Sequence, residues 1–359
     1  MGRTKLQQRQ LLRKWLKNRC KASRQSPRKS NGAMSVNCML SIKTAALAAV
    51  FVSLSPASAG PLAYVTNQKA DSISVIDLSD ERVSSTLSVG KDPAGVAVSQ
   101  DGARVIVTSP TARELAVIDG KQGLVRKTLT VGEGPLGVAI TADGRRGFVA
   151  DFYGHFVSVV DLDALEIIKR VPVGHYPAGV TVTQDGSRIF VAEREDDTVS
   201  WVDGVTLASQ RTVKVGRHPF GVLLDPEERR LFVANVESND VTVIDIDRFE
   251  VIATIPVGER PYALAFSRKT DSLFVTNQYD STVSVISGRE YKVVKVIPVG
   301  QYPEGIATDA LGEKVWVANW FDNSVSVIDA DRLQVTKTIS TGNGSRAFGQ
   351  FMPQGPLVR

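Results

Sequence analysis

Hydrophobic and polar residues alternate along this chain in short runs, and sets of four runs recur every 42 residues. A Val-Gly pair marks the period, at Val89-Gly90, Val131-Gly132, Val173-Gly174, Val215-Gly216, Val257-Gly258 and Val299-Gly300, with Thr341-Gly342 in the same register. The runs are short, rich in β-branched, aromatic and small residues, and bounded by turn formers, which predicts β-strands. A four-strand repeat of this length is the size of one propeller blade, whereas helical repeats would show a 3.6-residue apolar period.

Each repeat contains four strand signals. The first follows a Pro-x-Gly start, as in residues 93–98, and the second is an aromatic-Val-Thr/Ala-Asn element, as in residues 64–67. The third has the form Ser-Val-Ile-Asp, as in residues 74–77, and the fourth runs into Val-Gly, as in residues 251–257. Pairs such as Asp101-Gly102 lie between the first and second strands, where a tight hairpin needs positive φ. The glycines and aspartates of the repeat are therefore interpreted as turn residues.

The count of repeats predicts how the ring closes. The second strand occurs at Tyr64, Ile106, Phe148, Phe190, Phe232, Phe274 and Trp316. The first strand of the first blade has no copy before Leu62, but a matching segment lies at the other end of the chain, at residues 345–351. We therefore expect an all-β, seven-bladed propeller of four-stranded antiparallel blades, in which a C-terminal strand completes the first blade and leaves no open edge.

These elements resemble the YVTN family of β-propeller repeats, named after the tetrapeptide at residues 64–67, and the resemblance extends from about Ala63 to Phe351. It is specific for the fold, because all four elements return in register. Similar repeats occur in secreted and surface-layer proteins, in periplasmic proteins linked to quinoprotein metabolism and in relatives of cytochrome d1 proteins. The resemblance implies a binding or scaffold protein.

The N-terminal region has a different composition from the repeats. Residues 1–33 form a basic extension with eleven Lys/Arg and no acid, and residues 34–59 have an uncharged core followed by Ala57-Ser58-Ala59, as in a secretory signal peptide. The basic extension is a long n-region, or the result of a start site placed too early with Met34 or Met39 as the true start, or else a nucleic-acid-binding arm. We expect cleavage after Ala59, a single propeller domain at residues 60–359, and a periplasmic or secreted location.

Removal of the signal segment changes the charge and the thiol content. Twelve of the 43 Lys/Arg and none of the 38 Asp/Glu lie before Gly60, so the formal charge changes from +5 to −7. This argues against nucleic acid as a partner of the mature domain, and no membrane span is expected after cleavage. Both cysteines, Cys20 and Cys38, are in the removed part, so no disulfide, Cys ligand or covalent haem is expected. We expect a monomer.

Function is sought where the repeats differ. The loop after the second strand and the crossing to the next blade should open on one face, and loops on a rigid scaffold commonly carry binding residues. The aromatic, Arg and His residues of these loops are the candidate ligand-binding residues: Tyr153, His155, His175, Tyr176, Arg194, Arg217, His218, Arg260, Tyr262, Tyr302, Trp320 and Arg346. The alternative role for the aromatic and Arg side chains is packing around the mouth of the central channel.

All three histidines lie in one sector of this predicted face, together with two acids. Asp151, His155, His175, Glu193 and His218 are therefore weak candidates for a metal site or an axial ligand set. The simpler interpretation is that they are solvated or hydrogen-bonded loop residues, with no cofactor.

The chain contains no nucleophile elbow, zinc-protease helix motif or phosphate-binding glycine loop. The sequence therefore predicts an exported binding or scaffold propeller that recognises a small molecule, peptide, glycan or partner protein, and it assigns no catalytic residue. The alternative is an enzyme or cofactor protein, either a lactonase-like hydrolase or a quinoprotein- or haem d1-associated protein, that uses a His, acid and Arg cluster.

Overall fold

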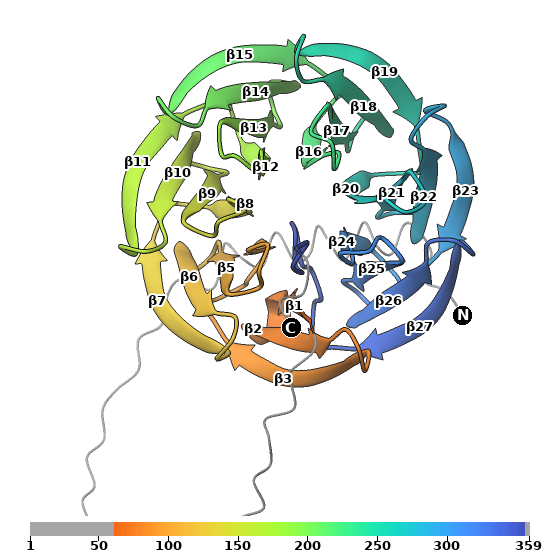
Figure 1. The fold of residues 1–359 in the computed structure, drawn as a ribbon, viewed down its shortest axis with the longest axis horizontal. Helices are drawn as coiled ribbons and strands as arrows, with labels where there is room; N and C mark the ends of the chain where they lie inside the picture. Colours follow the sequence, from red (N-terminus) through yellow and green to blue (C-terminus); the bar gives the residue numbers. More distant parts are fainter. Residues whose placement is uncertain (1–60, 356–359) are drawn as a thin grey trace, which may run out of the picture. The chain divides into compact units, whose positions relative to one another are not determined.

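The computed structural model describes residues 61–355, which form seven antiparallel sheets arranged as blades around one axis (Figure 1). The expected basic extension and signal peptide lie outside the described residues. Blade 1 contains β1 (Leu62–Asn67), β2 (Ser72–Asp77) and β3 (Arg82–Ser88), with η1 (Gln68–Ala70) between β1 and β2. Blade 2 contains β4 (Val96–Val98), β5 (Arg104–Ser109), β6 (Glu114–Asp119) and β7 (Leu124–Thr130). Blade 3 contains β8 (Pro135–Ile140), β9 (Arg146–Asp151), β10 (Phe156–Asp161) and β11 (Glu166–Pro172).

The remaining four blades repeat the same strand order. Blade 4 contains β12 (Pro177–Val182), β13 (Arg188–Glu193), β14 (Thr198–Asp203) and β15 (Ala208–Lys214). Blade 5 contains β16 (Pro219–Leu224), β17 (Arg230–Asn235), β18 (Asp240–Asp245) and β19 (Glu250–Pro256). Blade 6 contains β20 (Pro261–Ser267), β21 (Ser272–Asn277), β22 (Thr282–Ser287) and β23 (Val293–Pro298). Blade 7 contains β24 (Pro303–Thr308), β25 (Lys314–Asn319), β26 (Ser324–Asp329) and β27 (Gln334–Ser340). The expected fold is confirmed, and no helix of the described part is long and apolar enough to cross a membrane.

The core lies between the blades. The first residues of the aromatic-Val elements are fully or almost fully buried: Tyr64, Ile106, Phe148, Phe190, Phe232, Phe274 and Trp316. Each cluster of buried side chains combines residues of neighbouring blades, as Phe148 and Val159 of blade 3 do with Ile189 and Val202 of blade 4. A blade is therefore stable only beside its neighbours, which is why the ring must close.

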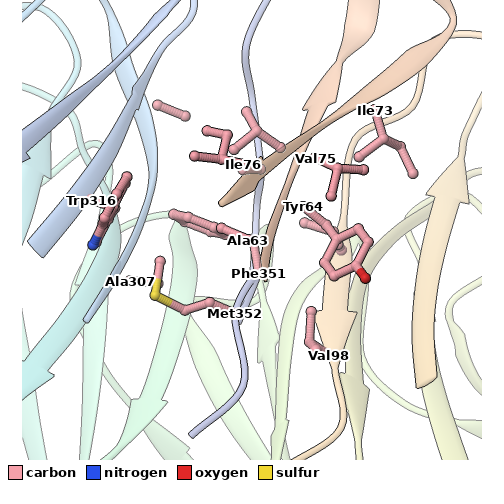
Figure 2. Close-up of a cluster of buried hydrophobic side chains, with 14 of the residues drawn as sticks. Ala63, Tyr64, Ile73, Val75, Ile76, Val98, Ala307, Trp316, Phe351 and Met352 are labelled. Carbon is pink, nitrogen blue, oxygen red and sulfur yellow. The ribbon is translucent and has the colours of Figure 1, made fainter. Parts of the chain in front are cut away.

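Closure occurs as expected, through the C-terminal segment. Arg346 N donates to Thr66 O (2.8 Å) and Tyr64 N donates to Phe351 O (2.8 Å), which places the segment at the inner edge of β1. Phe351 and Met352 are fully buried beside Ala63 and Trp316 (Figure 2). The segment pairs through isolated bridges rather than a full ladder, and it also pairs in parallel with blade 2, through Gly95 and Phe348. It thus joins two blades as well as completing one.

Close backbone approach explains the glycines of the repeat. A Cβ on Gly179, in the Pro-x-Gly element of blade 4, would lie 2.2 Å from the carbonyl oxygen of Phe220 in blade 5. A Cβ on Gly300 of the Val-Gly series would lie within 2.6 Å of the Asn319 side chain. Gly102, in an Asp-Gly turn, has φ of 71°, as the sequence predicted. The first two glycines leave space for a neighbour, and the third provides positive φ.

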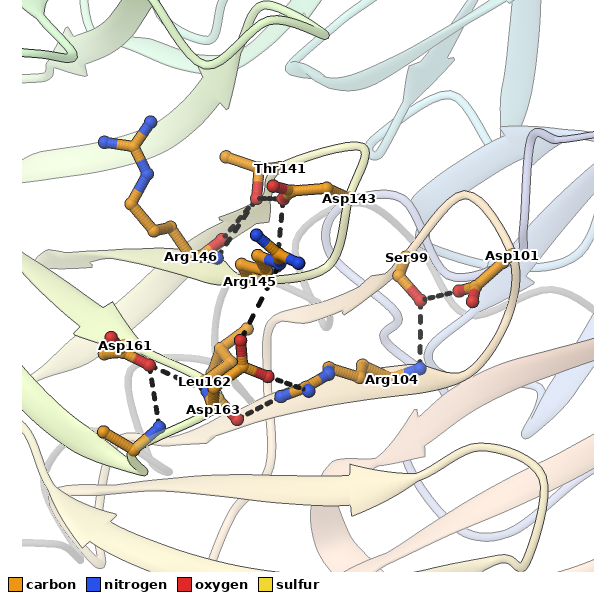
Figure 3. A network of polar contacts seen from close by, with 11 residues as sticks. Ser99, Asp101, Arg104, Thr141, Asp143, Arg145, Arg146, Asp161, Leu162 and Asp163 are labelled. Carbon is orange, nitrogen blue, oxygen red and sulfur yellow. Dashed lines mark hydrogen bonds and ion pairs between the residues drawn. The ribbon is translucent and has the colours of Figure 1, made fainter.

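Basic and hydroxyl side chains join each blade to the next near the turns. Arg146 Nη1 of blade 3 donates to Gly204 O of blade 4 (2.7 Å), and Arg188 Nη1 of blade 4 donates to Ile246 O of blade 5 (3.1 Å). Arg104 makes the same connection to Leu162 and Asp163 (Figure 3). Tyr64, Arg230, Lys269 and Lys314 connect the other four pairs of blades. Every described blade interface therefore has a polar contact in addition to its apolar core.

Candidate functional site

Two sets of loops share one end of the ring, here named the variable face. One set joins the second strand to the third within a blade, and the other crosses from the outermost strand to the innermost strand of the next blade. Backbone hydrogen bonds connect the two sets, for example from Phe152 N to Gly134 O (2.9 Å) and from Trp320 N to Tyr302 O (3.0 Å). The opposite end, the turn face, carries the other turns of each blade. The expectation that both loop sets share one face is confirmed.

The variable face is held in a fixed conformation by its own side chains. One position of the first loop set has positive φ in all seven blades, at Asp71, Arg113, His155, Asp197, Asn239, Ser281 and Asn323. Five of these side chains accept the backbone N–H of the residue 21 positions later; Asp197 accepts from His218 N at 2.8 Å, for example. His155 Nδ1 accepts from Tyr176 N at 3.1 Å, so this histidine replaces the Asp or Asn of other blades as an acceptor.

The first group of candidate residues is an aromatic and histidine cluster over blades 3 and 4. The Tyr176 ring lies 5.1 Å from both the Phe152 and His155 rings, and His155 lies 5.2 Å from His175. Tyr153 packs edge-on against Phe152 and is 60% exposed. The structure thus brings Tyr153, His155, His175 and Tyr176 together and leaves part of their surface accessible.

The second group is a chain of alternating charges over blades 4 to 6. Arg194 Nη2 lies 3.1 Å from His218 Nδ1, and the same histidine nitrogen lies 3.7 Å from Glu237 Oε1. Glu237 forms an ion pair with Arg260, whose guanidinium lies 5.3 Å from the centre of the Tyr279 ring. Arg217 is exposed beside this chain and donates to the backbone carbonyl of Glu237 (3.3 Å).

The third group closes the channel beneath the loops. Residues at the x position of the seven Pro-x-Gly-type elements are Ala94, Leu136, Ala178, Phe220, Tyr262, Glu304 and Arg346. The Phe220 ring stacks on Tyr262 at 4.3 Å, and Phe348 from the C-terminal segment packs on both, at 5.0 and 5.4 Å. Tyr262 is therefore a buried residue of the floor, and Arg346 at the same level is partly buried.

A buried ion pair lies within this floor. Arg346 Nε is 2.9 Å from Glu304 Oε2, and Arg346 Nη2 donates to the Tyr262 hydroxyl (2.5 Å). Gln278 Nε2 donates to the other Glu304 oxygen (3.2 Å). Burial raises the pKa of Glu304, and the charge of Arg346 opposes that rise. Burial also raises the pKa of the Tyr262 hydroxyl, which stays neutral and donates or accepts hydrogen bonds only.

Tyr302 and Trp320 complete the arc from blade 6 to blade 1. Tyr302 lies 5.8 Å from Trp320 and 5.1 Å from Phe321, and its hydroxyl pKa is raised by burial. Trp320 Nε1 donates to Gln68 Oε1 (3.0 Å), and Lys69 Nζ lies 3.9 Å from the Trp320 ring centre. Trp320 is 7% exposed, so its role is mainly to pack the loops of blades 7 and 1.

The five metal candidates do not form one site. Asp151 accepts four backbone N–H groups, including those of Glu133 (2.6 Å) and Gly154 (2.7 Å). Glu193 is buried and accepts from Gly174 N (2.6 Å) and from two hydroxyls. The three histidines bond to Tyr176 N, Asp196 and Arg194 respectively. Within residues 61–355 no three His, Cys, Asp or Glu side chains are placed to hold a metal ion.

A cavity of about 350 Å³ lies on the ring axis, on the opposite side of the floor from the variable face. It is lined by the innermost strands, by Phe348 to Gln350, and by turn residues such as Gln184, Glu228 and Asp309. None of the twelve predicted binding residues lines it. Sequence reasoning missed these lining residues because most of them belong to the repeated strand pattern. Only departures from the Asp-Gly turn, such as Glu227-Glu228 in blade 5 and Leu311-Gly312 in blade 7, could have marked them.

Comparison with solved structures supports the fold. Hydrazine synthase from Kuenenia stuttgartiensis matches with 20% identity and a TM-score of 0.66, over 70% of this chain and 87% of that chain. A functionally unknown protein from Desulfotomaculum acetoxidans matches with 15% identity and a TM-score of 0.74, over 83% and 100%. Dihydro-heme d1 dehydrogenase NirN in complex with DHE matches with 16% identity and a TM-score of 0.62, over 79% and 64%. At these identities the likeness concerns the fold alone.

No curated protein matches the chain. The family model of the YNCE-like β-propellers matches residues 35–146, 184–282 and 225–312, which together cover more than half of the sequence. The resemblance inferred from the repeated motifs is thereby confirmed at the level of the propeller class. With the seven blades and their register described above, this match shows that the chain belongs to the YNCE-like β-propeller family.

Proposed function

We propose that this chain is an exported, non-catalytic binding propeller whose variable face recognises a peptide segment of a partner protein. The accessible groups on that face are of the types enriched in protein recognition, namely tyrosine and arginine. They include exposed Tyr153, partly exposed Tyr176, and the charge chain formed by Arg194, Glu237 and Arg260. Charges of both signs beside aromatic rings suit the mixed side chains and backbone amides of a peptide.

One observation carries this proposal: side chains occupy backbone positions that favour glycine. Tyr176, His218, Arg260 and Tyr302 have φ between 52° and 61°, and Gly344 takes the equivalent position with φ of 75°. An L-residue in this region costs about 1–2 kcal/mol, so glycine is the default residue there. This backbone strain recurs at the same position in successive blades, although the side chain there differs from blade to blade. Such strain is typical of functional sites.

The turn face provides the matched contrast. Leu165, Leu207 and Phe249 also have positive φ, between 54° and 57°, but they pack into the cores between blades. The need to fill these cores accounts for the side chains at the three turn-face positions. Those of Tyr176, His218 and Arg260 have no equivalent position in the cores, which supports a role in binding.

The test uses glycine substitutions, which remove side chains without changing the backbone. The exported protein and a Tyr176→Gly, His218→Gly, Arg260→Gly variant are compared on peptide and glycan arrays. We expect peptides to bind the parent and to be lost by the variant, with little change in unfolding temperature. Leu207→Gly is the control and should lower the unfolding temperature while the remaining folded protein binds. Peptide binding that survives the triple change, or binding of glycans alone, would contradict the proposal.

Export is part of the proposal and has its own test. The uncharged segment before Ala57-Ser58-Ala59 supports cleavage and a mature chain that begins at Gly60. N-terminal sequencing of protein recovered from a bacterial periplasm should read Gly-Pro-Leu. A chain that still begins at Met1 or Met34 would refute it.

A further inference from the structure

The axial cavity is a blind pocket that opens on the turn face. Its inner end is formed by Phe348 together with Gly179, Gly221 and Ala263, which follow the floor residues in their strands. Ala178, Phe220 and Tyr262 themselves lie outside the lining, on the variable-face side. The outer rim consists of turn residues of blades 2 to 7 and of the C-terminal segment. A molecule in this pocket would therefore enter from the face opposite to the proposed peptide site.

The walls of the pocket are apolar and accessible. Ile140, Val182, Val222 and Leu224 line the pocket and are only half-buried, although they belong to the innermost strands of the ring. Phe348 adds an aromatic surface at the inner end. The volume is at the small end of the range of about 300–1,000 Å³ found for ligand pockets, which suits a small molecule with an apolar body.

The charged groups of the rim are mostly acidic. The lining includes the carboxylates of Asp225, Glu228 and Asp309, and Arg268 is its one Lys or Arg. Arg230 neutralises Asp225 at 2.8 Å. The Arg268 guanidinium donates to the carbonyl oxygen of Pro226 (3.3 Å).

Glu228 and Asp309 are held by backbone N–H groups rather than by ion pairs. Glu228 accepts Gln184 N (2.6 Å), and Asp309 accepts the backbone N–H groups of Glu313 (2.8 Å) and Lys314 (3.1 Å). Within residues 61–355 neither carboxylate forms an ion pair with a side chain. Burial raises the pKa of both carboxyl groups and neighbouring acids add to the rise, whereas their backbone hydrogen bonds, and for Glu228 the charge of Arg188, oppose it. A positive charge at the rim would offset this unfavourable environment.

We propose that the pocket binds a small amphipathic amine, with its ammonium group at the acidic rim beside Glu228 and its apolar body between the innermost strands. Cavity, wall and rim each contribute to the assignment. The apolar wall excludes strongly hydrated ligands, and the unpaired carboxylates select a cation over an anion of the same shape.

Binding at this site is coupled to closure of the ring. Phe348, Gly349, Gln350 and Gln354 belong to the lining and also to the C-terminal segment. Phe348 O and Gln350 O accept from Val96 N and Val98 N (2.9 Å each), and Gln354 Nε2 donates to Thr308 O (2.8 Å). A ligand that requires this segment in place binds the closed ring only, so it should raise the unfolding temperature in proportion to its occupancy.

The test compares three probes of similar shape by titration calorimetry on the full protein at neutral pH: 2-phenylethylamine, 2-phenylethanol and 3-phenylpropionate. We expect the amine to bind at least tenfold more tightly than the carboxylate, with the alcohol between them, and to raise the unfolding temperature. Glu228→Gln, which keeps the acceptor for Gln184 N, should reduce the preference for the amine and spare the alcohol. Equal affinity for amine and carboxylate, or no binding by the amine, would overturn the proposal.

A second variant tests the location. Val182→Trp fills the pocket and should abolish binding of the amine and the alcohol; Ile140→Phe serves if that variant does not fold. Tyr153→Ala on the variable face is the control and should bind all three probes as the parent does. Amine binding that survives pocket filling, or that is lost in Tyr153→Ala, would place the ligand elsewhere and refute the inference.

Discussion

The turn face and the variable face differ in how many residue types can hold their loops in place. Both hold their loops with side chains that bond to backbone N–H groups. On the turn face the residue is almost always the same: Asp161 accepts from Asp163 N and Ala164 N (2.8 Å each), and Asp119, Asp203, Asp245 and Asp329 do likewise in other blades. On the variable face Asp, Asn and His share the task.

The difference shows which parts of the repeat are fixed by folding. A carboxylate that must accept two adjacent N–H groups at a turn has few substitutes. A single acceptor for one N–H can be any of several residue types, and the next residue of the loop is then free to carry aromatic or charged groups. The variable face can therefore acquire binding residues without loss of the scaffold, whereas new chemistry on the turn face arises where a turn departs from Asp-Gly, as in the turns that contain Glu228 and Asp309.

The strand that connects the two faces should be the most sensitive element. The C-terminal segment runs from Arg346 in the variable-face floor to Gln354 at the rim of the turn-face pocket. Ending the chain at Gly344 removes buried Phe348, Phe351 and Met352, and burial of each such side chain contributes about 1.5–3 kcal/mol. We expect a loss of several kcal/mol in the free energy of unfolding, measured by urea denaturation.

A truncation after Gly355, which keeps the whole described segment, is the control and should unfold near the parent. Equal stability of the Gly344 truncation and the parent would show that the ring does not depend on this strand.

The ion pair in the variable-face floor should be the next most sensitive feature. Arg346→Met alone leaves Glu304 buried and uncompensated, and breaking a buried pair from one side costs about 3–5 kcal/mol. The double variant Glu304→Leu, Arg346→Met should recover most of this loss, because an apolar pair of similar volume often replaces a buried ion pair without penalty. Thermal and urea unfolding of the parent and the two variants measures this recovery; a double variant as unstable as the single one would give the pair a specific structural role.

The sequence predicted the fold almost completely because the recurring residues are those that build a blade. Residues such as Phe148, Gly102 and Asp161 take part in local strands and turns, and their spacing is enough to count blades and to find the closing segment. The candidate site was predicted less well, because its parts depend on contacts across the ring. Nothing in the spacing of Phe220, Tyr262 and Phe348 shows that they meet on the axis. Likewise, the sequence does not reveal that the carboxylates of Asp151 and Glu193 already accept backbone N–H groups.

Arginines on the two faces should differ in what they contribute to stability. Arg146 on the turn face donates to Gly204 O of the next blade (2.7 Å), and hydrogen bonds from charged groups contribute about 1.5–3 kcal/mol. Arg146→Ala should therefore destabilise the protein by about that amount. Arg217→Ala on the variable face removes an exposed side chain and should change stability by less than about 0.5 kcal/mol. Chemical denaturation of both variants measures the contrast, and equal effects would remove the distinction between a structural face and a permissive one.

The smallest expected effect is a pH dependence that arises on the turn face. Hydrogen bonds from Ala164 N and Asp163 N hold the pKa of Asp161 below its ordinary value of 3.8. A carboxyl group whose pKa is lower in the folded state stabilises the protein above its unfolded pKa, and this contribution is lost as pH falls through the folded pKa. Unfolding temperatures measured between about pH 6 and pH 3 should therefore fall with acid, and Asp161→Asn should show a shallower decrease. Tyr153→Ala on the variable face is the comparison and should retain the acid sensitivity of the parent below pH about 4, because it leaves the carboxylates and their hydrogen bonds in place. If Asp161→Asn follows the parent curve throughout, the turn carboxylates do not set the acid stability of the ring.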